Sequence, residues 1–218
     1  HYVQKASPVY GALRSLGYSE ARSVGVYTVD LSMGRESVWN GMVPNKRRKI
    51  RQAERSQARF LRDDADVEMA NKMLLEAGRR GGFTPLRLSW LQAYKAAYGA
   101  RKRFALFFVE VGGRRVSCAL VLTHGKTALC PAAGSFEEGW EARPNDFMHW
   151  KIMEWAIEEG IGRYNMGGVS TDPSSSGYGV YRWKKEYGGT IDDLAVLRKR
   201  ILPAVGDMVG VVRRRGDE

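Results

Sequence analysis

The sequence has little histidine and little cysteine, with three and two residues among 218. His1, His124 and His149 lack the spacing of metal ligands, and no CxxC or Cys/His cluster surrounds Cys118 or Cys130. We therefore predict no metal site. Both cysteines fall in runs typical of strands, which favours reduced core residues of a cytoplasmic protein. A disulfide between neighbouring strands is the alternative.

Long apolar runs are also missing. No segment approaches the roughly 20 apolar residues that a membrane-spanning helix needs, and no signal-peptide pattern is visible. Acidic residues are outnumbered, because 35 Lys and Arg stand against 24 Asp and Glu and give a formal net charge of +11. A basic surplus on a globular chain favours polyanionic partners, namely nucleic acid, nucleotide-linked substrates or an anionic membrane. A basic protein without such a partner is the alternative.

The hydrophobic periodicity predicts an α/β fold with a mixed central sheet flanked by helices. Strands are expected at 23–31, 104–111, 116–122, 127–133, 163–166 and 190–197, and helices at 37–43, 45–58, 67–80, 85–98, 147–159 and 178–187. Turn pairs containing glycine separate the strands between 104 and 133, which predicts an antiparallel meander. Their nearly continuous apolar content indicates a sheet covered on both faces.

The first chemical signal lies at the end of a predicted strand. The strand at 163–166 is followed by Gly167 and Gly168, so backbone N–H groups are uncovered where α/β sheets bind ligands. A polar loop at 170–176 follows and is able to close over a substrate. A helix at 178–187 then brings aromatic and cationic side chains back toward the sheet. The alternative is an ordinary turn and an amphipathic helix with solvated lysines.

The second signal is a basic cluster on the helix expected at 45–58. It comprises Lys46, Arg47, Arg48, Lys49 and Arg51. Arg47, Arg51 and Arg55 share one helical face, where each like-charged pair costs a few tenths of a kcal/mol. Such a face is better explained if it contacts phosphates. The alternative is a solvated face that Glu54 partly neutralises.

Taken together, five segments resemble the motifs of the FemABX peptidyltransferases and their acetyltransferase-like relatives. The segments are VDLS at 29–32, RRKIRQAE at 47–54, RPN at 143–145, YNMGG at 164–168 and GVYRWKK at 179–185. The resemblance extends over roughly residues 23–197. It departs from the family pattern at Trp183, where Phe is common, and at Asn165, where the family has aspartate.

The resemblance implies a GNAT-like acyltransferase domain at 23–200, a remnant of a preceding copy at 1–22 and a basic tail at 201–218. It implies transfer of an amino acid from aminoacyl-tRNA to an amine of a peptide or peptidoglycan precursor, with no cofactor besides that co-substrate. A second GNAT-like copy or a homodimer is a further expected partner. The alternatives are an acyl-CoA-dependent N-acyltransferase, for which no convincing Q/RxxGxG/A loop is found, and a non-catalytic RNA-binding module.

Roles can also be expected for individual residues, and the resemblance implies those of Lys184 and Arg87. Lys184 is expected to stabilise the tetrahedral oxyanion, and Trp183 to pack beside the terminal adenosine of tRNA or simply to fill the core. Substrate binding is expected of Arg87, Asn145, Asn165, Gly167, Gly168, Tyr178 and Tyr181. Phosphate binding is expected of Arg47, Arg48, Arg51 and Lys185. The general base stays open between Asp172, Asn165 acting through a water, and a substrate phosphate.

Overall fold

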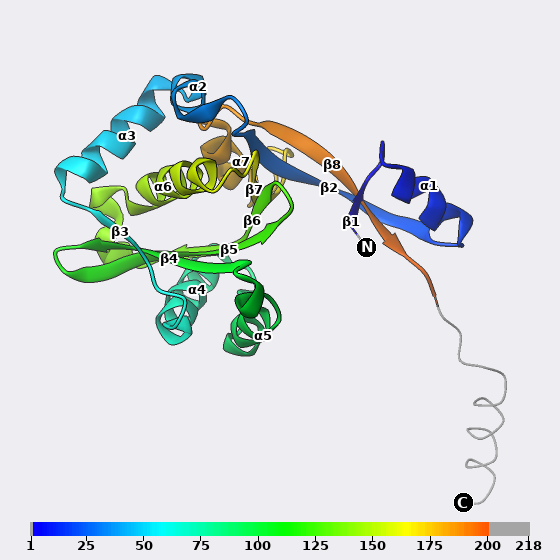
Figure 1. Cartoon of the computed structure of the whole chain (residues 1–218), viewed down its shortest axis with the longest axis horizontal. Coiled ribbons are helices and arrows are strands. Elements are labelled where there is room, and N and C mark those ends of the chain that lie inside the picture. The colour runs from blue at the N-terminus through cyan, green and yellow to red at the C-terminus, as the bar shows by residue number, and fades with distance from the viewer. Residues whose placement is uncertain (1, 201–218) are drawn as a thin grey trace, which may run out of the picture. The chain divides into compact units, whose positions relative to one another are not determined.

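The structure is a computed structural model that describes residues 2–200 (Figure 1). The basic tail predicted at 201–218 lies outside the described residues. The chain divides into two compact units. The larger unit is Gly25–Asp192, and the smaller unit combines the residues before Gly25 with those after Asp192. Strands β2 (Ser19–Asp30) and β8 (Thr190–Arg198) contribute residues to both units.

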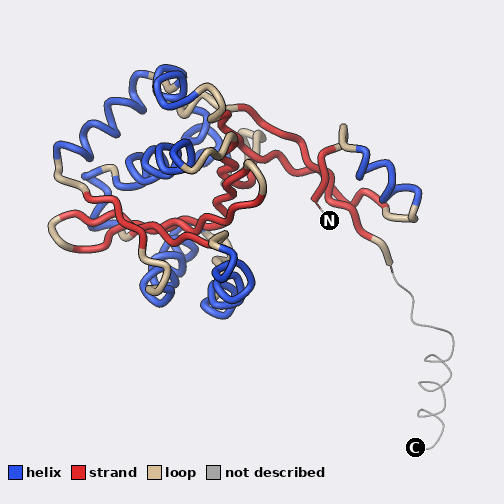
Figure 2. The backbone as a smooth tube through the Cα atoms, viewed as in Figure 1, coloured by secondary structure: helices blue, strands red, loops and turns tan. Residues whose placement is uncertain are grey.

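The larger unit contains a mixed sheet flanked by helices, as predicted (Figure 2). Its other strands are β3 (Arg59–Arg62), β4 (Phe104–Val111), β5 (Arg114–His124), β6 (Thr127–Ser135) and β7 (Arg163–Val169). Its helices are α2 (Gly34–Gly41), α3 (Pro44–Arg55), α4 (Val67–Gly81), α5 (Leu88–Tyr98), α6 (Pro144–Glu158) and α7 (Tyr178–Lys185), with 3-10 turns η1 (Gly99–Arg101) and η2 (Glu137–Ala142). The strand order is β2-β7-β6-β5-β4-β3. Only the β6–β7 pair among these neighbours is parallel, and β4, β5 and β6 form the predicted antiparallel meander.

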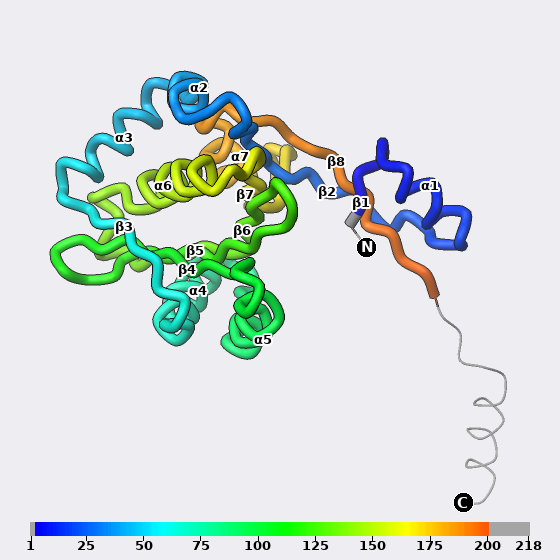
Figure 3. Tube along the Cα trace, in the orientation of Figure 1, coloured from blue at the N-terminus to red at the C-terminus, as the bar shows by residue number. Residues whose placement is uncertain are grey.

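Two hydrophobic cores cover the two faces of this sheet. Helices α2, α3 and α6 lie on one side, and α4 and α5 lie on the other (Figure 3). Alternate residues of β4 enter different cores, with Phe107 and Val109 in one and Leu106 and Phe108 in the other. Period-two alternation therefore explains why β4 is apolar at every central position. The prediction that the meander is covered on both faces is confirmed.

Close backbone approach fixes α4 against the sheet. A Cβ atom on Gly134 would lie 2.7 Å from the carbonyl oxygen of Met73, so only glycine lets β6 and α4 come this close. Cys118 and Cys130 are both buried, as predicted, in the two different cores, and both are free. Burial raises the pKa of Cys118 to about 12 and that of Cys130 to about 11, so both thiols stay protonated at neutral pH.

The smaller unit contains β1 (Tyr2–Gln4) and α1 (Pro8–Ser15). Ser7 caps α1 by accepting a hydrogen bond from the backbone of Val9, and Pro8 occupies the first helical turn. Strand β1 pairs antiparallel with β8. The origin of residues 1–22 in a preceding copy stays a prediction. Among the described residues, none of the helices is both long and apolar enough to span a bilayer.

Candidate functional site

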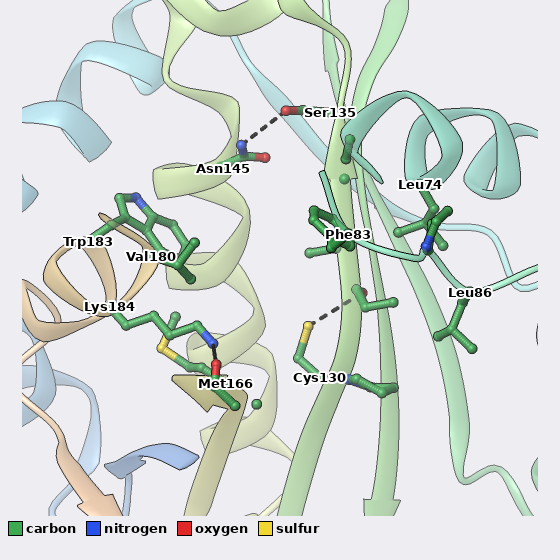
Figure 4. Close-up of a pocket in the computed structure, with 18 of the residues that line it drawn as sticks. Leu74, Phe83, Leu86, Cys130, Ser135, Asn145, Met166, Val180, Trp183 and Lys184 are labelled. Carbon is green, nitrogen blue, oxygen red and sulfur yellow. Dashed lines mark hydrogen bonds between the residues drawn. The ribbon is translucent and has the colours of Figure 1, made fainter. Parts of the chain in front are cut away.

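A pocket opens where the single parallel strand pair separates. Pairing between β6 and β7 runs from Thr127 with Arg163 to Leu129 with Asn165. Beyond that point the two strands line a pocket of about 650 Å³, together with the end of α4, the segment 83–86, α6 and α7 (Figure 4). The pocket thus lies at the carboxyl ends of two parallel strands, where the sequence places a ligand site.

Gly167 shapes the floor of this pocket. Its φ of +83° falls in the left-handed region, and a Cβ atom there would lie 3.2 Å from the carbonyl oxygen of Cys130. The amide oxygen of Asn165 accepts the N–H of Gly167 at 2.8 Å and holds this turn. The glycine is therefore needed both for its conformation and for space. The same Cβ position lies 3.9 Å from Nζ of Lys184.

Lys184 is buried in the pocket wall, with 7% of its surface exposed. Its Nζ donates a hydrogen bond to the carbonyl oxygen of Gly168 at 2.9 Å, which directs it toward the exit of β7 (Figure 4). Burial lowers the pKa of Lys184 to about 8. None of the described residues that line the pocket is an aspartate or glutamate. The ammonium is therefore present at neutral pH and lacks a counter-ion in the pocket.

Trp183 is held by a buried charge network beneath the pocket. Its Nε1 donates to Oδ1 of Asp146 at 2.9 Å, and the same oxygen accepts a hydrogen bond from Lys46. The Lys46 ammonium lies 3.3 Å from a carboxylate oxygen of Glu186, and 4.6 and 4.2 Å from the ring centroids of Trp183 and Tyr187. These contacts tie α3, α6 and α7 together, so they fix the orientation of the indole.

Lys46 belongs to the basic cluster at 46–51 but does not share the surface of the arginines that are expected to bind phosphate. Its side chain is fully buried. Lys46, Ile50 and Ala53 are the buried residues of α3, and their spacing directs one face of the helix against α6. The basic run therefore splits between an inward and an outward face.

His149 lines the pocket, although sequence reasoning gave it no role. It is buried, and its Nδ1 lies 2.6 Å from the hydroxyl of Tyr164. Burial, reinforced by the nearby Lys184 and Lys46, lowers the pKa of His149 to about 3, so the ring is neutral at pH 7. A ring of such low basicity is poorly suited to act as the general base. No spacing pattern signals it, because nearly every position of the first three turns of α6 is buried.

The end of the pocket near η2 is polar, and of its members the sequence analysis gave a role only to Asn145. Oγ of Ser135 accepts hydrogen bonds from Nε1 of Trp140 at 3.0 Å and from Nδ2 of Asn145 at 3.1 Å. Arg80 donates to the carbonyl oxygen of Ser135 at 2.7 Å, and its guanidinium carbon lies 4.9 Å from the Trp140 ring centroid. These polar residues come from four separate elements, α4, β6, η2 and α6. No local sequence motif could therefore predict that they lie together.

The predicted site residues fall into two sets. Those that line the pocket are Asn145, Gly167, Gly168, Trp183 and Lys184. Those outside its lining are Arg87, Asn165, Tyr178, Tyr181, Lys185, Arg47, Arg48 and Arg51. Arg87 is exposed at the start of α5, while Tyr178 and Tyr181 contact each other on α7 at 5.8 Å between ring centroids. Asp172 is exposed in the loop after β7, where Ser174 donates hydrogen bonds to it.

The outward arginines of α3 contact neutral partners. Arg47 donates to the amide oxygen of Asn40 at 3.5 Å, and Arg48 donates to that of Asn45 at 2.9 Å. The guanidinium of Arg51 lies 5.3 Å from the ring centroid of Trp39. Amides and an indole do not cancel positive charge, so this surface keeps its attraction for anions.

Comparisons with known proteins point to one family. The acetyltransferase (GNAT) domain family matches residues 43–185. Aminoacyltransferase FemB of Staphylococcus epidermidis is 39% identical over 49 residues, a match that spans 22% of this chain and only 12% of FemB. The crystal structure of FemX has a TM-score of 0.75 at 15% identity and covers 86% of this chain and 67% of FemX. The structure of L-PGS from Bacillus licheniformis has a TM-score of 0.63 at 11% identity and covers 100% of this chain and 73% of L-PGS. The two structures share the fold.

Proposed function

Because the chain belongs to the acetyltransferase (GNAT) domain family, we propose that it is an acyltransferase of the aminoacyl-tRNA-dependent kind. It would transfer an amino acid from aminoacyl-tRNA to an amine of a peptide or of a peptidoglycan precursor, in the cytoplasm. Support comes from the short segment that is similar to a protein named aminoacyltransferase FemB. The net charge of +11 and the uncancelled arginines of α3 favour a polyanionic donor.

One observation carries the proposal: the buried Lys184 ammonium faces a pocket without a carboxylate among its described lining residues. An aminoacyl ester is already activated, so aminolysis needs a neutral amine near the carbonyl and stabilisation of the tetrahedral oxyanion. Nζ of Lys184 would donate to that oxyanion while its bond to Gly168 holds it in place. Removing a single oxyanion donor typically costs about 3–4 kcal/mol of transition-state stabilisation.

The pocket favours a substrate-borne base over a protein base. His149 is too weakly basic, the amide oxygen of Asn165 already accepts the N–H of Gly167, and Asp172 does not line the pocket. Of the three alternatives for the general base, a phosphate of the substrate therefore fits best. Lys184, with its pKa of about 8, would remain the proton-bearing group at neutral pH.

The experiment that tests the proposal is a donor competition. The protein is incubated with a mixture of charged tRNAs and with acetyl-CoA, in the presence of candidate amines, and the consumption of each donor is measured. We expect aminoacyl-tRNA to be consumed by the wild type and not by Lys184→Met. Arg182→Met is the matched control, since Arg182 is an exposed cation on the same helix and does not line the pocket.

An acyl-CoA donor is the second candidate, favoured by the name of the matching family itself. Consumption of acetyl-CoA alone would replace the first proposal with this one. Tight RNA binding without consumption of either donor would instead indicate the non-catalytic RNA-binding alternative. In that case Lys184 could be replaced without effect.

A further inference from the structure

The Lys184 pocket has two walls that belong to the two different hydrophobic cores. Leu74 and Leu86 pack with one core, whereas Met166 and Trp183 pack with the other. Figure 4 draws these pairs on opposite sides of the pocket, with Lys184 on the side of Trp183. An acyl donor and an amine acceptor can therefore lie against different walls, and the proposed function assigns only the acyl group, beside Lys184.

The wall opposite Lys184 is apolar. It combines side chains of α4 with side chains of the segment that follows this helix, and we call it the α4 wall. Its members are Leu74, Ala77, Phe83, Pro85 and Leu86. Phe83 lines the pocket with 53% of its surface exposed. The α4 wall therefore leaves apolar area that a ligand would remove from water.

Contacts with α4 hold the segment 83–86 in place. The backbone N–H of Phe83 donates to the carbonyl oxygen of Gly78 at 3.2 Å, and Nδ2 of Asn71 donates to that of Leu86 at 3.3 Å. A Cβ atom on Gly78 would lie 2.7 Å from Cδ of Pro85, so only glycine lets the segment fold back this closely. A wall that is already formed loses little conformational entropy when a ligand binds.

The charges of the pocket restrict what can lie on the α4 wall. Lys184 and Arg80 line the pocket, and its described lining includes no carboxylate. A cationic side chain of the acceptor would be repelled and would find no counter-ion. An anionic side chain would lose water against a wall whose side chains form no hydrogen bonds, and it would compete for the ammonium that the oxyanion needs. An uncharged apolar side chain meets neither difficulty.

Asn145 supplies a hydrogen-bond acceptor to the same pocket. Its Nδ2 donates to Oγ of Ser135 at 3.1 Å, which orients the amide. Its Oδ1 is buried and accepts no hydrogen bond from any described residue. In Figure 4 this oxygen points to the side of the pocket on which Phe83 lies. A buried acceptor without a donor gains a hydrogen bond from a ligand N–H, and the neutral amine that aminolysis needs is such a donor.

We propose that the α4 wall binds an apolar side chain next to the acceptor amine, so that the acceptor is a peptide with leucine, methionine or phenylalanine at its N-terminus. The α-amine donates to Oδ1 of Asn145 and faces the acyl carbonyl beside Lys184. Its nitrogen bonds to the carbonyl carbon, the bond from that carbon to the leaving oxygen or sulfur breaks, and the proton that the nitrogen loses ends on the leaving group. The proposal rests on the proposed function only in requiring an amine acceptor, and it holds for either acyl donor.

The test compares four dipeptides that differ only in the N-terminal side chain, namely Leu-Gly, Gly-Gly, Asp-Gly and Arg-Gly. Two quantities are measured on the full chain for each dipeptide. One is the Kd without donor, from NMR titration, and the other is kcat/KM with charged tRNA or with acetyl-CoA. We expect Leu-Gly to exceed Gly-Gly by about 10- to 200-fold in kcat/KM, the range in which an apolar pocket discriminates between side chains. Asp-Gly and Arg-Gly should not exceed Gly-Gly.

Variants of Phe83 locate the preference on the α4 wall. Phe83→Ala should lower the ratio of Leu-Gly to Gly-Gly by about tenfold, and Phe83→Leu should restore most of it. Phe83→Glu should raise the ratio of Arg-Gly to Gly-Gly about two- to fivefold, as expected for a partly exposed ion pair. A change of preference of this kind does not result from general loss of structure. Leu75→Ala is the matched control, since Leu75 is an exposed apolar residue of α4 that does not line the pocket.

The two measurements separate the acceptor site from the proposed function. Tighter binding of Leu-Gly that Phe83→Ala abolishes, without consumption of aminoacyl-tRNA, keeps the site and removes the proposed donor. Transfer with the same kcat/KM for all four dipeptides overturns the acceptor site and keeps the proposed function. A preference for Leu-Gly that is the same in wild type and Phe83→Ala also overturns the site, as does failure of every dipeptide to bind.

Discussion

Two buried lysines lie in neighbouring regions of the larger unit, one beneath the pocket and one in its wall. Lys46 is fully buried and contacts the carboxylates of Asp146 and Glu186. Lys184 is almost as buried, yet its hydrogen-bond partner is the carbonyl oxygen of Gly168. Burial lowers the pKa of both, and only for Lys46 do carboxylates oppose it.

The comparison distinguishes a buried lysine whose charge is balanced by carboxylates from a buried lysine whose charge is not balanced. A buried ion pair is neutral overall and mainly fixes the groups that form it. A buried cation without a counter-ion instead destabilises the folded chain and is attracted to any negative charge that develops nearby. The region around Lys46 holds Trp183 in place, whereas we propose that the unpaired Lys184 acts on a substrate.

The largest expected effect comes from breaking the paired region. Asp146→Ala leaves the Lys46 ammonium buried with a weaker partner, so the free energy of unfolding should fall by about 3–5 kcal/mol. Urea denaturation followed by far-UV circular dichroism measures it. Asp172→Ala is the control, because Asp172 is exposed and should leave the urea midpoint unchanged. A similar midpoint for both variants would show that the Lys46 network does not hold the helices together.

The next effect concerns the unpaired region. Lys184→Ala should lower turnover by about 10²–10³-fold, because the oxyanion loses its donor. The free energy of unfolding should stay the same or rise, since an unpaired buried cation is removed. Single-turnover rates under saturating donor, together with urea denaturation, measure the two quantities. Unchanged turnover would remove Lys184 from the mechanism and would end the contrast between the two lysines.

A third prediction uses the pKa of about 8 for Lys184. Activity that needs the ammonium should decline as pH rises through about 8. Lys184→Arg should move that decline to higher pH, because a guanidinium stays protonated. The unfolded lysine keeps its ordinary pKa near 10.5, so between pH 8 and 10.5 the unfolded state binds more protons and stability rises with pH. A pH profile of kcat/KM that is identical for both proteins would contradict this assignment.

The smallest effect is expected on the outward face of α3. Charge reversal in Arg47→Glu and Arg51→Glu should weaken binding of a tRNA and lower the salt slope of log Kd by about one for each phosphate that the helix no longer neutralises. Arg101→Glu is the matched control, since it makes the same charge change on an exposed arginine in η1. Salt slopes that do not differ between the α3 variants and the control would restore the solvated-face alternative.

Much of the fold could be predicted from local sequence patterns. Strand β4 was predicted with its observed bounds, because apolar residues at nearly every position and a following glycine pair leave few alternatives. Strand β3 was missed, since RFLR has only four residues and pairs at the sheet edge with β4. The predicted start of α6 at 147 was late because Pro144, which opens the helix, precedes the apolar run.

The candidate site could be predicted from the sequence only in part. The resemblance to FemABX proteins is confirmed by the GNAT family match, the FemB segment and the FemX fold, and it directs attention to Lys184. It gave no role to Arg80, Trp140 or His149, because their neighbours in space are far away in sequence. Ser135, for example, lies 55 positions from Arg80, whose guanidinium it contacts.

The sequence by itself determined the α/β layering, the glycine pair at the end of β7 and the presence of Lys184 on the next helix. These features depend on hydrophobic periodicity and on residues that are close together in the chain. Tertiary structure alone decided which cations of the run at 46–51 are buried and which are exposed. A helix presents every side chain in turn, and only its packing partner selects the face that loses water. The contrast between a paired Lys46 and an unpaired Lys184 therefore arises from where α6 and the residue after α7 place their carboxylates.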